Sequence, residues 1–139
     1  MNNFLKSELA KYGCIFTVAF VLNAVWENAH AFLYVHYQGE FITEMILLRA
    51  SLFDAVITTF IALLFFNIIK TQYALYLSVF TLVVFAIGLE WWAIETSRWA
   101  YGEGMPIIPF LNTGLTPTIQ LGLLGYISIR IALKLVTRV

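Results

Sequence analysis

Four long apolar segments limit what this chain can fold into. They cover residues from about 12 to 35, 45 to 69, 73 to 99 and 118 to 136. A helix needs about 20 mainly apolar residues to cross the hydrocarbon layer of a bilayer, and each segment supplies them. The sequence therefore predicts an all-α polytopic membrane protein, with four transmembrane helices in an antiparallel bundle and residues 1–139 as one domain.

The composition excludes several classes of protein. Hydrophobic residues make up 61% of the chain and charged residues 12%, against about 25% charged in a typical soluble domain. The net charge is zero and no basic tract is present, so no nucleic-acid partner is expected. The single cysteine, Cys14, excludes a disulfide within the chain. Membrane lipids are the expected partners, with a second copy of the chain or a partner membrane subunit as further candidates.

The start of the chain has some features of a secretory signal. A basic start precedes an apolar run, and Ala29-His30-Ala31 matches a small-x-small cleavage site. The apolar pattern continues past this point, however, through Phe32 to Val35. We therefore expect the first segment to be a retained helix.

The distribution of charge predicts an orientation. With four spans, six of the eight basic residues fall on one side and seven of the eight acids fall on the other. Because basic residues favour the cytoplasmic side, both termini are expected in the cytoplasm, in a bacterial-type inner (plasma) membrane. The six basic residues are Lys6, Lys11, Lys70, Arg130, Lys134 and Arg138.

Four of the acids, Glu27, Asp54, Glu90 and Glu95, interrupt the apolar segments. An ionisable group inside a bilayer costs a few kcal/mol or more, so it usually faces the protein interior and has a partner. At about 1.5 Å of rise per residue, these acids fall in the outer half of the membrane. The sequence predicts a polar pocket there, capped by the proline-containing loop of residues 101–117.

The first helix is expected to carry one continuous polar face. Asn23, Glu27, His30 and Tyr34 follow the spacing i, i+4, i+7, i+11. Glu27 and His30 are close enough in sequence to touch, and a Glu–His pair in a dry site suits proton transfer. The alternative is a hydrogen-bonded pair that only fixes two helices together.

The Glu-x-x-His spacing also occurs in di-metal bundles, but it occurs once here, so no metal is expected.

The other helices supply candidate partners for the acids. Asp54 is expected to pair with His30 and Glu95 with Arg98, which lies three residues further on. Arg49 is expected to extend to the membrane interface. On the fourth helix Gln120 is the clear polar candidate, and its small residues are expected to serve helix packing; these are Gly122, Gly125, Ser128 and Ala132.

Aromatic residues gather beside these charges on the third segment. Trp91, Trp92 and Trp99 lie near its outer end. Tryptophans at this depth are typical of the aromatic belt of membrane proteins. A tryptophan wall beside acids would also suit the stabilisation of a carbocation through cation–π contact. Both interpretations remain open on the sequence alone.

One stretch of about 30 residues, from 90 to 118, matches the pattern of a known family. The matching residues are Glu90, Ala93, Arg98-Trp99-Ala100-Tyr101 and Gly114-Leu115-Thr116-Pro117. The stretch resembles the membrane lycopene-cyclase domain of carotenoid synthesis. That family has an acid, a Trp-x-Tyr-like aromatic pair and a small-apolar-x-Pro turn leading to paired glutamates. This chain has Thr118-Ile119-Gln120 where those catalytic acids stand. The resemblance implies an isoprenoid substrate.

The leading hypothesis is a small membrane enzyme or binder that acts on a lipid or isoprenoid, with Glu27 and His30 transferring protons. The alternatives are a non-enzymatic accessory or scaffold subunit and a proton-coupled transporter protomer. The sequence identifies no cofactor. The catalytic candidates are Glu27, His30, Asp54, Glu90, Glu95 and Arg98, and the substrate-binding candidates are Asn23, Trp91, Trp99, Tyr101 and Gln120.

Overall fold

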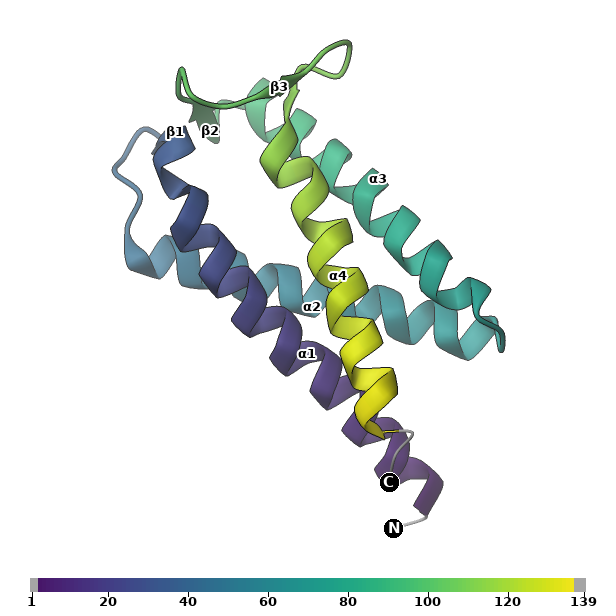
Figure 1. Cartoon of the computed structure of the whole chain (residues 1–139). Helices are drawn as coiled ribbons and strands as arrows, with labels where there is room; N and C mark the ends of the chain where they lie inside the picture. Colours follow the sequence, from purple (N-terminus) through teal and green to yellow (C-terminus); the bar gives the residue numbers. More distant parts are fainter. Residues whose placement is uncertain (1–2, 137–139) are drawn as a thin grey trace.

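The chain folds into four long helices, seen in a computed structural model that describes residues 3–136 (Figure 1). All four helices are long and apolar enough to cross a membrane, as the sequence predicts. The helices are α1 (Asn3–His30), α2 (Glu44–Ile68), α3 (Tyr73–Glu95) and α4 (Leu115–Val136). Arg138, one of the residues used to predict the orientation, lies outside the described residues.

The predicted ends of the first and third helices are wrong. α1 ends at His30 and is followed by a 3-10 turn (Ala31–Leu33) and strand β1 (Tyr34–Tyr37). α3 ends at Glu95, and the chain turns at Ser97, with φ of 54°, into strand β2 (Trp99–Tyr101). β1 and β2 pair antiparallel, with Tyr34 opposite Tyr101. The pairing supplies the backbone hydrogen bonds that the expected extra helical turns would have supplied.

The segment of residues 102–114 packs over the strand-bearing end of the helices. It contains a second pair of short strands, β3 (Ile107–Ile108) and β4 (Thr113–Gly114). The backbone N–H of Gly102 donates to the Leu33 carbonyl at 2.7 Å, and Met105 is buried. The hydrogen bond attaches the segment to the 3-10 turn that follows α1. α4 begins directly after β4, three residues before the predicted start.

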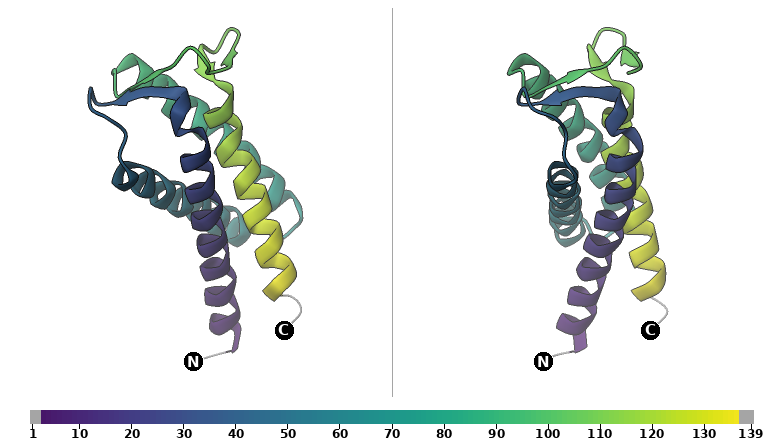
Figure 2. Two further views of the ribbon diagram at one scale, coloured as in Figure 1. Left: turned by 60° about the vertical axis from the view of Figure 1, so that its left-hand side comes forward. Right: turned by 90° about the vertical axis from the view of Figure 1, so that its left-hand side faces the viewer.

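The four helices do not run side by side along their whole length. α1 packs against α2 and α4, and α3 packs against α4 and α2. Figures 1 and 2 show α2 crossing obliquely behind α1 and α4, so its first turns diverge from α1 below the strands. The start of α1 and the end of α4 lie at the same end of the molecule, away from the strands (Figure 2).

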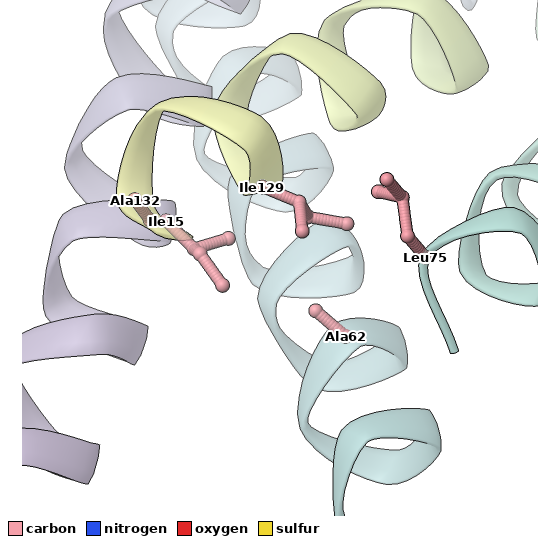
Figure 3. Close-up of a cluster of buried hydrophobic side chains, with 5 residues drawn as sticks. All are labelled: Ile15, Ala62, Leu75, Ile129 and Ala132. Atoms are coloured by element: carbon pink, nitrogen blue, oxygen red, sulfur yellow. The ribbon is translucent and has the colours of Figure 1, made fainter. Parts of the chain in front are cut away.

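An apolar cluster holds the helices together at the end away from the strands. One or two side chains from each helix meet there (Figure 3). Ile15 and Ile129 are almost fully buried. The cluster comprises Ile15, Ala62, Leu75, Ile129 and Ala132. At the other end of the molecule the helix interior is polar.

The small residues of α4 let α3 approach closely, as predicted. A Cβ atom added at Gly122 would lie 2.4 Å from Cγ2 of Val83. A Cβ atom at Gly125 would lie 2.5 Å from Cδ1 of Leu82. The side chain of Val83 is short and β-branched, so it has little freedom to move aside.

We expect Gly122→Ala to lower the free energy of unfolding by about 1–3 kcal/mol, the usual cost of overpacking. Gly88→Ala on α3 is the matched control, because nothing lies within 4 Å of its added Cβ. That control should be neutral or stabilise by up to about 1 kcal/mol, since alanine favours helix. Reversible unfolding in mixed micelles measures both. Equal effects at the two glycines would contradict the close approach of α3 and α4.

Candidate functional site

A cavity of about 390 Å³ lies among the strand-bearing ends of the helices. Every long helix and both strands of the first pair contribute to its lining. Three of the acids predicted to face a pocket line it together, one each from α1, α2 and α3. Its polar and aromatic lining residues are Glu27, Tyr34, His36, Tyr37, Arg49, Phe53, Asp54, Glu90, Trp92, Arg98, Trp99 and Gln120. Its remaining walls are apolar, from Ala31, Ile42, Ile46, Leu47, Ala50, Ala86, Leu89, Pro117 and Leu121.

Gln120 joins three helices at the inner side of this cavity. Its side-chain Nε2 lies 2.9 Å from Oδ1 of Asn23, 2.7 Å from Oε1 of Glu27 and 3.1 Å from Oδ2 of Asp54. An amide nitrogen carries two hydrogens, so it serves two of these three acceptors at a time. Gln120 and Asn23 are both buried. The amide thus holds two carboxyl groups from α1 and α2 close together.

Glu90 is held by a second set of donors. The Tyr101 hydroxyl and the Trp99 indole N–H, the latter at 3.3 Å, both donate to its Oε2. The backbone N–H of Gly114 in turn donates to the Tyr101 oxygen at 2.8 Å. Strand β2 therefore fixes one oxygen of a carboxyl on α3, and β4 fixes the tyrosine that binds it. Glu90 is 5% exposed.

Each of the three carboxyl groups keeps one oxygen without a hydrogen bond from residues 3–136. The donors reach Oε1 of Glu27, Oδ2 of Asp54 and Oε2 of Glu90. One oxygen held by protein donors fixes the position of a carboxyl group, and the other oxygen can bind a ligand. This arrangement is suited to acid–base chemistry.

Two tyrosine hydroxyls lie beside the acids, on the strands outside the spans. Burial, followed by the nearby Glu90, raises the pKa of Tyr34. Burial and its hydrogen bond to Glu90 raise the pKa of Tyr101, against the opposing effect of the Gly114 N–H. Both phenols therefore stay protonated at neutral pH. They can donate hydrogen bonds and cannot act as bases.

His30 is placed differently from the prediction. No hydrogen bond joins it to Glu27 or Asp54; its Nδ1 lies 2.7 Å from the carbonyl oxygen of Trp26 on its own helix. The ring packs edge-on against Tyr34, with 5.5 Å between the ring centroids, and it does not line the cavity. The expected partner of both acids, the histidine, is replaced by Gln120.

The outer end of α3 also departs from the prediction. Because α3 ends at Glu95, Arg98 lies beyond the helix and the expected i, i+3 ion pair is not present. Glu95 is exposed, and the Arg98 guanidinium instead stacks over the Trp92 ring, 4.5 Å from its centroid. Trp91 is 61% exposed and does not line the cavity. An exposed tryptophan at this position suits the aromatic belt.

The predicted residue set lacks six of the polar and aromatic residues that line the cavity: Tyr34, His36, Tyr37, Arg49, Phe53 and Trp92. The alternation of Tyr34 and His36 with the exposed Val35 was the available signal, because a period of two indicates a strand. Arg49 gave no comparable signal. It is exposed, as expected for an arginine at an interface, and also reaches the cavity.

Among the described residues, no group of three or more His, Cys, Asp or Glu side chains could hold a metal ion. Comparison of this chain with protein-family models, with curated proteins and with solved structures found no match.

Proposed function

We propose that this chain is a multi-pass membrane protein whose cavity binds a lipid or isoprenoid and exchanges protons with it. The three carboxyl groups, each with one oxygen held and one oxygen without a protein donor, carry this proposal. They share the cavity with aliphatic and aromatic walls, a surface that suits a hydrocarbon ligand. We assign the proton transfers to Glu27, Asp54 and Glu90 in place of His30.

The reaction we propose is proton transfer at a carbon–carbon double bond. One carboxylic acid gives its proton to one carbon of the double bond, and a carboxylate then removes a proton from a neighbouring carbon. The double bond is restored or shifted, and the net charge does not change. Trp99 lines the cavity, and its ring would stabilise the intermediate cation.

The resemblance to the lycopene-cyclase domain supports an isoprenoid ligand. Several residues that carry it, Glu90, Trp99, Tyr101 and Gly114, belong to one hydrogen-bonded cluster. The chain lacks the paired glutamates of that family at residues 118–120. For this reason we propose acid–base chemistry on an isoprenoid and not that family's cyclisation.

We further propose that the four helices pack antiparallel, with both termini in the cytoplasm of a bacterial-type inner membrane. The distribution of Lys and Arg supports this orientation. The cavity would then lie in the outer half of the bilayer, where an isoprenoid could enter from the lipid phase. Cysteine-accessibility labelling at Glu40 and Lys70 in intact cells tests it, since only the site on the outer side should react.

The test of function uses the purified protein in neutral detergent. A ligand that binds the native state raises its apparent stability, so farnesol, geranylgeraniol and total polar lipids are added in turn and the melting temperature is measured. Any stabilising lipid is then incubated with the protein in D₂O, and its mass is measured. Deuterium incorporation that depends on the protein supports the proposal. Absence of both stabilisation and deuterium uptake contradicts it.

A scaffold role is the second candidate, and the Gln120 contacts favour it. One buried amide linking α1, α2 and α4 would fix the relative positions of these helices, which is a known use of buried polar groups. In that case removing a carboxyl group lowers stability and no lipid raises the melting temperature. The lipid titration therefore separates the two candidates.

A further inference from the structure

The two arginines of the cavity differ from its acids because they make no side-chain hydrogen bonds to the described part of the protein. Each of the three acids accepts a hydrogen bond from a protein side chain. Within residues 3–136, neither Arg49 nor Arg98 donates a side-chain hydrogen bond, and the one ion pair joins Lys11 to Glu8, 2.7 Å apart. The cavity thus contains two guanidinium groups whose donors are unused.

Arg98 is held in position without using those donors. Its backbone carbonyl accepts the N–H of Gln38 at 2.5 Å, next to the β1–β2 pairing. Its guanidinium lies over the face of Trp92, and a contact with a ring face satisfies none of the five N–H groups of an arginine. The side chain is therefore positioned but still able to bind an anion.

Two further groups with hydrogen-bond donors line the same cavity. Arg49 reaches it from α2, about 7.5 Å along the helix axis from Asp54 at 1.5 Å per residue. His36 reaches it from β1, and its Nδ1 accepts the N–H of Gly39 at 3.1 Å. Since Nδ1 is an acceptor, Nε2 carries the proton and is a further donor. The strands and the first turns of α2 thus place donors from three elements around the cavity.

We infer that the ligand of this cavity carries an anionic head group, a phosphate or a carboxylate, which binds Arg49 and Arg98. This inference rests on the proposed function and specifies its class of substrate: an anionic amphiphile. Arginine suits both groups, because its planar fork of donors matches two oxygens at once.

The same arrangement of residues indicates which part of the cavity binds each end of the ligand. The head group binds at the arginines, and the hydrocarbon chain lies against apolar walls such as Ile46 and Leu89. Carboxyl groups repel a second anion, so the acids face the chain and not the head. This is the placement that proton transfer at a double bond requires. A neutral lipid would make none of the charge-assisted hydrogen bonds that an anionic head group makes with the two guanidinium groups.

The test compares ligands that differ only in the head group. Binding to the purified protein in neutral detergent is followed by tryptophan fluorescence, since Trp92 and Trp99 line the cavity. The first pair is farnesyl phosphate and farnesol, and the second is palmitate and hexadecanol. We expect at least one anion to bind about tenfold or more tightly than its neutral partner, since hydrogen bonds between charged groups are worth at least that factor.

Variants show whether the preference arises at this site. Arg49→Gln and Arg98→Gln should each weaken the binding of the anion more than that of the neutral alcohol, and so reduce the preference for the anion. Arg130→Gln is the matched control, because Arg130 is exposed on α4 and does not line the cavity. It should keep the full preference.

The outcomes separate this inference from the function on which it rests. A preference for phosphate alone or for carboxylate alone supports the inference and identifies the head group. Equal binding of alcohol and anion overturns the inference while leaving lipid binding intact. A loss of preference in Arg130→Gln equal to that in the other variants also overturns it. Failure of all four compounds to bind contradicts the proposed function itself.

Discussion

Replacing Gln120 by leucine should lower the free energy of unfolding by about 3 kcal/mol. The substitution removes the donor that Glu27 and Asp54 share. The amide makes two hydrogen bonds at a time, and a buried acceptor left without its donor costs about 1–3 kcal/mol. This exceeds the average of about 0.6 kcal/mol for hydrogen bonds between membrane helices, because the acceptors are carboxyl groups. Reversible unfolding in mixed micelles measures the difference.

Two further variants make this prediction specific. Gln72→Leu is the matched control, because Gln72 is exposed in the turn before α3 and makes no capping hydrogen bond. Its effect should stay within about 0.5 kcal/mol. In a double-mutant cycle, Glu27→Met should cost less in the Gln120→Leu protein than in the wild type, since the acid has already lost its donor. Additive effects would show that the amide does not stabilise the carboxyl group.

The four helices could be predicted because apolar length is a local property. The second span was placed within one residue at each end, and α4 within three. The end of α1 could not be predicted, because the apolar and aromatic pattern continues from the helix into the strand without a break. The end of α3 could not be predicted from Glu95 and Arg98, because their spacing also fits a continuing helix. The chain leaves α3 through Ser97, which has a positive φ but is not the glycine or proline that usually marks such a turn.

The sequence could identify several residues of the candidate site, but it could not show which of them form hydrogen bonds with one another. Glu27, Asp54, Glu90 and Gln120 stand out as polar interruptions of apolar segments, and the structure brings all four to one cavity. The hydrogen-bond partners of these residues could not be predicted. Gln120 lies 97, 93 and 66 residues from Asn23, Glu27 and Asp54, and helical periodicity does not say which faces meet. Sequence proximity therefore favours His30 as the partner, whereas in the structure the His30 ring contacts the Trp26 carbonyl.

Replacing Glu90 by glutamine should lower the rate of deuterium uptake into the bound lipid by about 100-fold or more. General acid–base catalysis by a positioned side chain contributes about 10²–10⁴ in rate, and an amide cannot supply it. The glutamine oxygen can still accept from Tyr101 and Trp99, so the protein should fold and bind its ligand. Mass spectrometry of the lipid after incubation in D₂O measures the rate, and a melting curve checks the fold.

Glu95→Gln is the matched control for this experiment. It makes the same chemical change on the same helix, but Glu95 is exposed and lies outside the cavity, so the wild-type rate should be retained. Tyr101→Phe removes a donor that positions Glu90 without removing the carboxyl group. It should therefore lower the rate less than Glu90→Gln does. A wild-type rate in Glu90→Gln would exclude this carboxyl as a proton-transfer group and leave Glu27 and Asp54 to supply both transfers.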